Sequence, residues 1–151
     1  MTIKLKKLDT KSDIDLFAKY KVSLIKLHQQ YAEKIGLNDQ KVKEYDENDA
    51  IRHIGKSNYY QFIIIYNNQE VGIIEYNIET SDIDNLKILY IKNIFIDSKY
   101  RKLGIGKAVL LEIRKQTNLR IELECWYGMP ANDLYKNLGM KEIKTRYIWN
   151  Q

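Results

Sequence analysis

The sequence predicts one mixed α/β (α+β) domain in which a central sheet is flanked by helices. Two segments rich in β-branched residues, 60–66 and 71–78, are separated by turn residues and predict an antiparallel hairpin. A third apolar segment, 86–96, runs into a glycine-containing loop that opens an amphipathic helix, which is typical of a helical crossover. No repeat or linker divides the 151 residues, so we expect a single domain spanning 1–151.

The first third of the chain predicts one strand and two helices. Residues 3–8 alternate in the pattern of a first strand. Ser12 and the acids after it resemble the start of a long helix, which we expect to end just before a capping Gly36. A second, short helix is predicted to begin within 46–49 and to end at Gly55.

The last third predicts alternating helices and strands. The helix after the glycine loop is expected to end near Gln116 or Thr117, and a strand is expected over 120–126. Pro130 suits the first turn of the next helix, and a final strand is predicted over 142–149. The predicted order is therefore β-α-α-β-β-β-α-β-α-β.

Composition excludes several classes of protein. The 25 basic and 20 acidic side chains are spread along the chain, and the strand-like setting of many of the 12 tyrosines is explained by packing, so we expect no nucleic-acid partner. The lone Cys125 excludes an internal disulfide, fits a reducing compartment and is interpreted as a structural strand residue. No apolar segment approaches the length of a membrane span, so we expect a cytoplasmic protein without membrane partners. His28 and His53 are not spaced as metal ligands, so no metal is expected.

The most informative segment is the glycine loop, residues 101–107. It brings helix N-terminal amides, two glycines and basic side chains to one point, which predicts a phosphate site. Its spacing fits neither a Walker loop nor a dinucleotide fingerprint, because one residue separates the glycines and Val109 stands where a third glycine would be. The residues proposed to hold the phosphates are Arg101, Lys102, Leu103, Gly104, Ile105, Gly106 and Lys107.

This loop resembles motif A of the GCN5-related N-acetyltransferases, Arg/Gln-x-x-Gly-x-Gly/Ala, read here from Arg101 to Gly106. A second segment, 134–141, is similar to the later Leu-Tyr-x-x-x-Gly-Phe element of the family, with Met140 in place of the aromatic residue. Both elements follow a predicted strand and occur in the family's order. The resemblance covers residues 60–149, and the N-terminal third only by its general layout.

The resemblance implies a sheet splayed between its fourth and fifth strands and an acetyl-CoA-dependent N-acetyltransferase. The acceptor would be a primary amine on a small molecule or a protein N-terminus. The glycine loop would hold the pyrophosphate, and the pantetheine arm would lie along the main chain of Ile94, Phe95 and Ile96. Tyr135, the tyrosine of the second motif, would protonate the leaving thiolate; the alternative is a helix tyrosine that packs on the sheet.

The general base is left open by the sequence. The segment 86–93 carries no carboxylate, whereas family members often have a glutamate there. Glu124 stands in a Leu-Glu-Cys that resembles the Leu-Glu-Val of ribosomal-protein N-terminal acetyltransferases, where the glutamate is the base; an ordinary exposed strand glutamate is the alternative. Glu75 and Glu79 are reserves, and a water chain without a dedicated base is a further possibility.

A further departure concerns the cofactor contact before the motif tyrosine. Gly128 replaces an asparagine that is common in the family, and Asn132 is the proposed substitute for its contact to pantetheine; a solvent-facing helix residue is the alternative. The acidic segment 44–49 suits either a polycationic acceptor or a helix N-terminus. Two other functions stay open: a catalytically silent acyl-CoA-binding or regulatory module, and a basic nucleic-acid-binding domain, which the diffuse charge disfavours. A homodimer is kept as an open expectation.

Overall fold

The computed structural model describes residues 2–149, and its centre is one five-stranded sheet. The strands lie side by side in chain order, antiparallel from the first to the fourth, and the fifth is parallel to the fourth. They are β1 (Ile3–Lys7), β2 (Tyr59–Tyr66), β3 (Gln69–Thr80), β4 (Lys87–Ile96) and β5 (Arg120–Leu123). A parallel pair needs a crossover, and the helix between β4 and β5 supplies it. The predicted mixed sheet with flanking helices is confirmed.

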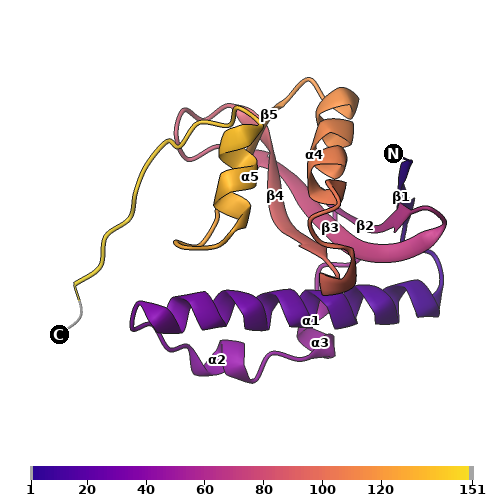
Figure 1. The fold of residues 1–151 in the computed structure, drawn as a ribbon, viewed down its shortest axis with the longest axis horizontal. Coiled ribbons are helices and arrows are strands. Elements are labelled where there is room, and N and C mark those ends of the chain that lie inside the picture. Colours follow the sequence, from indigo (N-terminus) through magenta and orange to yellow (C-terminus); the bar gives the residue numbers. More distant parts are fainter. Residues whose placement is uncertain (1, 150–151) are drawn as a thin grey trace.

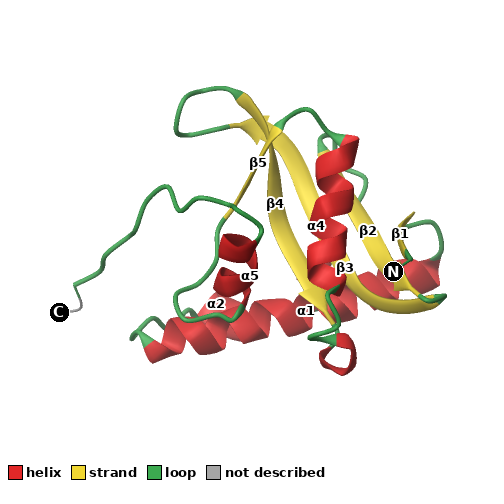
Figure 2. Cartoon of the chain, turned by 45° about the horizontal axis from the view of Figure 1, so that its top comes forward, coloured by secondary structure: helices red, strands yellow, loops and turns green. Residues whose placement is uncertain are grey.

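Helices cover both faces of this sheet (Figure 1). One face carries α1 (Lys11–Lys34), and α2 (Gln40–Lys43) and α3 (Glu47–Ala50) pack against α1. The opposite face carries α4 (Ile105–Gln116) and α5 (Ala131–Asn137), and a short 3-10 turn, η1 (Ser98–Tyr100), precedes α4. Figure 2 shows α4 and the long α1 on opposite sides of the yellow sheet. The layered arrangement is the one that buries both sheet faces.

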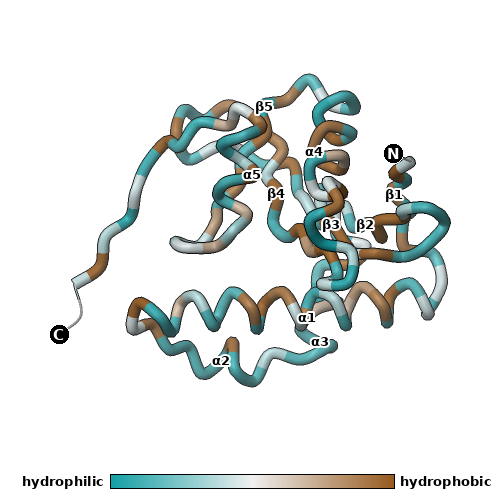
Figure 3. Tube along the Cα trace, in the orientation of Figure 1, coloured by the Kyte–Doolittle hydropathy of each residue, from teal (hydrophilic) through white to brown (hydrophobic). Residues whose placement is uncertain are grey.

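The core is divided between the two faces by the alternation of the strands. Ile74 and Ile91 join the larger cluster with Val109 and Ile113 of α4. Ile73, the next residue along β3, points the other way and packs on Phe17 and Tyr20 of α1. The apolar tint of the central strands in Figure 3 follows from this burial on both sides.

The start of α1 differs from the sequence prediction by two residues. The N-cap is Thr10, not Ser12, and Thr10 and Asp13 form a reciprocal capping box. The Asp13 carboxylate also accepts from the Asp9 amide and from Lys6 Nζ, at 3.0 and 2.8 Å. Ser12 also has an aspartate three residues after it, but Asp13 is the acid that Lys6 and the Asp9 amide bind as well, and the helix begins at the box that contains it.

This cap makes part of the stability pH-dependent. The hydrogen bond from Lys6 and those from the Thr10 and Asp9 amides lower the pKa of Asp13 from 3.8 to about 2. The folded pKa lies below the unfolded one, so the contribution is present above about pH 4 and is lost as the pH falls towards about 2. We expect Asp13→Asn to lower the melting temperature at neutral pH and to flatten its decline in this acid range. A thermal melt series checks this, with Asp15→Asn in the same helix as control; equal slopes for Asp13→Asn and wild type would contradict it.

The end of the chain corrects two predictions. The fifth strand stops at Leu123 instead of residue 126, and no strand forms over 142–149 within the described residues. Residues 141–149 are extended coil that leaves the body of the fold (Figure 1), and Tyr147 and Trp149 are 87% and 91% exposed. Alternating apolar residues indicate strand propensity, but a strand needs a paired backbone, and this segment pairs with no strand among residues 2–149.

Candidate functional site

The glycine loop leads from the end of β4 into the first turn of α4. The main chain of Lys102 and Gly104 is left-handed, with φ of 63° and 81°, and Gly104 is the N-cap of α4 without a side-chain cap. The first helical amide with a main-chain partner is that of Ala108, which donates to Gly104 at 3.1 Å. The amides of the preceding helical residues 105–107 have no main-chain partner within 2–149. A concentration of unpaired N–H groups at a helix N-terminus is an anion site.

The basic side chains of the loop do not all have the same role. Arg101 Nε donates to the main-chain oxygen of Ile96 at 2.9 Å, and its guanidinium lies 5.2 Å from the centre of the Phe95 ring. Arg101 therefore fastens the loop to the end of β4, in addition to its positive charge. Lys102 and Lys107 are exposed and are in no ion pair that the structure describes. Their ammonium groups are available to a phosphate.

The apolar and small residues of the loop anchor it. Ile105 is buried in the larger core cluster, while Leu103 is half exposed. At Gly106 a Cβ would stand 3.3 Å from Leu134 Cδ2 of α5. The second glycine thus allows α5 to pack closely on α4, a packing role that its motif position did not indicate. Gly104, with its left-handed main chain, is the glycine of the anion site itself.

The fourth and fifth strands separate beside this loop, as predicted. Their pairing ends at Ile91 and Leu123, whereas β4 continues to Ile96. A β-bulge lies at the parting point, since Glu75 pairs with Asn93 and Tyr76 with Ile91, which leaves Lys92 without an opposite residue. From Lys92 onwards the outer edge of β4 has no strand partner among the described residues, and in Figure 2 β5 diverges from β4 towards α5.

The three predicted cofactor residues on β4 lie along this open edge. The side chains of Ile94 and Ile96 pack on the α4 side and Phe95 on the α1 side, which leaves the main chain between them. The Ile96 oxygen already accepts from Arg101, and the next amide, that of Asp97, donates to Val71 at 2.8 Å. Main-chain groups alternate in direction along an antiparallel strand, so those of Phe95, like the Asp97 amide, face β3, and the Phe95 oxygen lies against Gly72. The main-chain edge open to an extended ligand arm therefore centres on Ile94.

A recess opens between the separating strands, and it is the site at which four elements meet. Its polar and titratable lining residues come from α1, β4, the segment just after β5 and α5; they are His28, Lys92, Asn93, Glu124, Cys125 and Tyr135. Both predicted catalytic residues, Glu124 and Tyr135, thus line one recess. Ile94 also lines it, so the recess is continuous with the open edge of β4.

Tyr135 is held in the protonated form. It lies on α5, packs against the larger core cluster, and burial together with the nearby Cys125 raises its pKa to about 12. Burial likewise raises the pKa of the Cys125 thiol. A protonated phenol in a recess is a proton donor at neutral pH.

Glu124 lies on the exposed side of the recess. Burial, the charge of Glu124 and a hydrogen bond between Glu124 and the Tyr90 hydroxyl raise the pKa of Tyr90. The two reserve acids, Glu75 and Glu79, are each bound to another side chain. Glu75 is 2% exposed and ion-paired with Lys21, and Glu79 accepts from Asn77 Nδ2 at 2.7 Å. Neither lines the recess, so Glu124 is its one carboxylate among the described residues.

The Asn132 side chain stabilises the turn before α5. Its Nδ2 donates to the main-chain oxygens of Trp126 and Met129, at 2.9 and 3.0 Å, and so closes the turn before α5. Within this turn Gly128 has a φ of 82°, a left-handed conformation that glycine adopts without strain. A contact from Asn132 to pantetheine would therefore use its carbonyl oxygen.

Four of the polar lining residues were not among the predicted site residues: His28, Lys92, Asn93 and Cys125, the last of which was interpreted as a structural strand residue. Burial lowers the pKa of His28, so its imidazole is neutral at neutral pH. Nothing in the spacing of the sequence connects α1 with the strand parting. For Asn93 a signal existed, since an amide in an otherwise apolar strand end just before the glycine loop is unusual.

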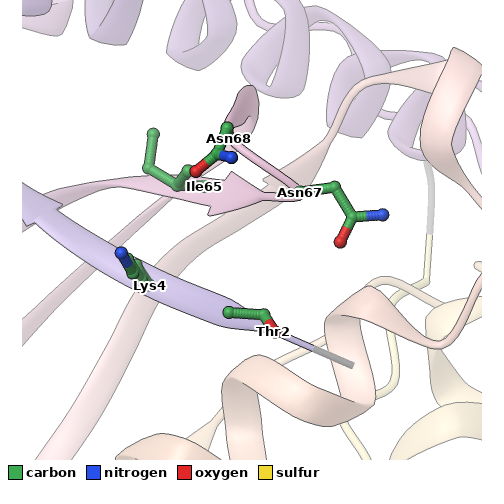
Figure 4. A pocket seen from close by; sticks show the side chains of 5 residues that line it. All are labelled: Thr2, Lys4, Ile65, Asn67 and Asn68. Carbon is green, nitrogen blue, oxygen red and sulfur yellow. The ribbon is translucent and has the colours of Figure 1, made fainter.

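A second recess lies at the far edge of the sheet, by β1 and the β2–β3 turn (Figure 4). It is lined by Thr2, Lys4, Ile65, Asn67 and Asn68. It contains no acid–base pair among these lining residues and does not adjoin the glycine loop, so it adds no chemistry to the site.

The described residues also bear on metals and membranes. Across residues 2–149 no three His, Cys, Asp or Glu side chains are placed to hold a metal ion. In the same part of the chain no helix combines the length and apolar character of a membrane span.

A comparison with known protein families identifies the family of the chain. The model of the acetyltransferase (GNAT) domain matches residues 57–142, more than half of the chain, and this match includes the glycine loop and the second motif. The protein belongs to the GNAT acetyltransferase family. No curated protein matches the sequence.

Solved structures share the fold at low sequence identity. An acetyltransferase-type protein from Bacillus subtilis, YycN, superposes with a TM-score of 0.77 at 17% identity and covers 99% of both chains. AAC(6')-Iy in complex with the bisubstrate analogue CoA-S-monomethyl-acetylneamine gives 0.67 at 11% identity, covering 100% of this chain and 99% of that one. The aminoglycoside 6'-N-acetyltransferase AAC(6')-Ig from Acinetobacter haemolyticus gives 0.66 at 11%, covering 100% and 98%. These likenesses extend over the whole domain.

Proposed function

We propose that the protein is an acetyl-CoA-dependent N-acetyltransferase that acts on a primary amine of a small molecule or a protein N-terminus. The observation that carries the proposal is the continuity of three features: unpaired amides at Gly104–Lys107, an open β4 edge, and a recess that holds Tyr135. Phosphates at the first feature, an extended arm along the second and a thioester in the third form one continuous path. Membership of the GNAT family supports this path.

The reaction needs a held cofactor, a polarised carbonyl and two proton movements. Amides of the glycine loop and the ammonium groups of Lys102 and Lys107 bind the pyrophosphate. The free main-chain groups of Ile94, at the open edge of β4, bind the pantetheine arm, and an N–H of this edge polarises the thioester carbonyl. The amine attacks the carbonyl carbon, a C–N bond forms, and the C–S bond breaks.

Tyr135 and Glu124 have the two proton roles in this proposal. The Tyr135 phenol gives its proton to the departing sulfur, and the acylated nitrogen returns a proton to it through water. Glu124 accepts the proton that the acceptor ammonium loses before it attacks. Glu124 suits this role because it is exposed and lines the recess together with Tyr135.

The test combines binding and turnover. Isothermal titration of the purified protein with acetyl-CoA is followed by an assay of CoA-thiol release with spermidine, kanamycin and a short peptide with a free N-terminus. Saturable binding and release with at least one amine are expected. Binding without release on any amine would instead favour the silent acyl-CoA-binding module, and an absence of binding would contradict both.

A further inference from the structure

Under the splayed strands, four polar side chains form a buried cluster on the α1 side of the sheet. Lys21 Nζ donates to Glu75 Oε1 at 2.9 Å, and Gln61 Nε2 donates to Glu75 Oε2 at 3.1 Å. Asn93 Nδ2 donates to Glu75 Oε1, also at 2.9 Å. The Lys21 and Glu75 side chains are 6% and 2% exposed. One carboxylate thus joins α1 to three adjacent strands.

Such a cluster is a costly way to stabilise a core. Removing two charges from water costs several kcal/mol per ion. A buried ion pair therefore seldom stabilises the folded state more than apolar side chains of equal volume would. Its clearer effect is to fix geometry, because each partner has a defined direction. The cluster touches the recess through Asn93 alone, since Asn93 lines the recess and the other three do not.

The cluster determines the orientation of the Asn93 amide. Because Nδ2 donates to a carboxylate, the carbonyl oxygen Oδ1 must occupy the other side of the amide. Within residues 2–149 Oδ1 accepts no hydrogen bond from the protein, and it is not among the buried unpartnered atoms. A fixed, accessible acceptor oxygen is therefore presented at the wall of the recess.

The face on which Asn93 lies indicates what that oxygen meets. The glycine loop and α4 are on one side of the sheet, and Ile94 points towards them. Asn93 pairs with Glu75 on the α1 side, so its oxygen lies across the sheet from the pyrophosphate site. A thioester that enters along the β4 edge from the α4 side leaves the α1 side open to the attacking amine.

We propose that Asn93 binds the acceptor: its Oδ1 accepts a hydrogen bond from the N–H of the attacking amine, while Glu75 and Lys21 are positioning residues that hold the amide in place. The inference rests on the proposed N-acetyltransferase function. It assigns the acceptor side of the site to residues that no motif marks. An amine that loses this hydrogen bond binds less tightly but leaves the cofactor path unchanged.

The experiment measures acceptor KM and acetyl-CoA affinity separately. Asn93→Ala is assayed with spermidine, kanamycin and the free peptide, and acetyl-CoA is titrated calorimetrically. We expect the KM of each amine that the wild type acetylates to rise about tenfold or more, with the acetyl-CoA Kd within about twofold of wild type. Asn77→Ala is the matched control, because it removes a buried amide from the neighbouring strand β3 without touching the recess.

A double variant tests the positioning residues. Lys21→Met with Glu75→Gln removes both buried charges together, so that no single charge is stranded. A melting curve establishes that it folds, and a higher acceptor KM with unchanged acetyl-CoA Kd is expected.

The possible outcomes are distinguishable. Unchanged acceptor KM in Asn93→Ala, or an equal loss of amine and acetyl-CoA binding, overturns the inference while the proposed function stands. A wild-type protein that acetylates none of the three amines overturns the proposed function and the inference with it.

Discussion

Gly104→Glu is expected to abolish acetyl-CoA binding, with a loss of affinity of about 100-fold or more. The substitution places a carboxylate at the N-cap of α4, where the unpaired amides of the glycine loop face the ligand. Like charges brought together at a binding site cost several kcal/mol, and each 1.4 kcal/mol is about a factor of ten in affinity. Isothermal titration with acetyl-CoA measures the effect.

Main-chain strain alone does not account for that loss, and a matched variant separates the two. Gly104 has a φ of 81° and Gly55 a φ of 79°, so glutamate is equally strained at both positions. A Cβ at Gly55 meets nothing within 4 Å, and Gly55 is remote from the loop in sequence. Gly55→Glu should therefore bind acetyl-CoA as wild type does. Retention of affinity in Gly104→Glu would contradict the assignment of the loop.

Tyr135→Phe is expected to lower kcat by about 100-fold and to change the acetyl-CoA Kd by less than about twofold. The ring keeps its packing, and only the proton donor is lost. Tyr76→Phe is the control, since Tyr76 is another tyrosine that packs on the same core cluster. Equal losses in kcat and acetyl-CoA affinity would make Tyr135 a packing residue instead.

The pH profile adds an independent check on the same residue. Since burial raises the pKa of Tyr135 to about 12, the phenol stays protonated through the alkaline range of an assay. Ionisation of Tyr135 should thus cause no fall of kcat below about pH 10. The raised pKa would be contradicted if the wild-type kcat fell at a pH near the usual pKa of a thiol or an amine and this fall were absent from Tyr135→Phe.

The sequence predicted the structure best where the residues needed for binding also determine the local backbone conformation. The glycine loop requires a left-handed residue and a helix start within a few positions, and both are visible as Gly104 followed by an amphipathic pattern. The hairpin and the parting of β4 from β5 follow from strand patterns and from the family resemblance. These features depend on neighbours in the chain or on a known motif.

The remainder depends on contacts between distant segments. The ion pair of Lys21 with Glu75 joins residues that are 54 positions apart. The helical period places Lys21 in line with Phe17 and Leu24 on the buried face, but nothing local indicates its partner on β3. Likewise, Gly106 packs against Leu134, and this second role depends on where α5 lies relative to α4, which the sequence does not indicate. The predicted strand over 142–149 was wrong because alternation shows propensity and not the presence of a partner edge.

The proposed function requires the glycine loop and the open edge of β4 to hold acetyl-CoA. Its most direct test is a titration of ¹⁵N-labelled protein with CoA, followed through the amide signals of each residue. We predict the largest shifts at Gly104–Lys107 and at Ile94, with the amide of Gly55 unmoved. Saturation of the protein with CoA while the signals of the glycine loop stay in place would contradict the claim.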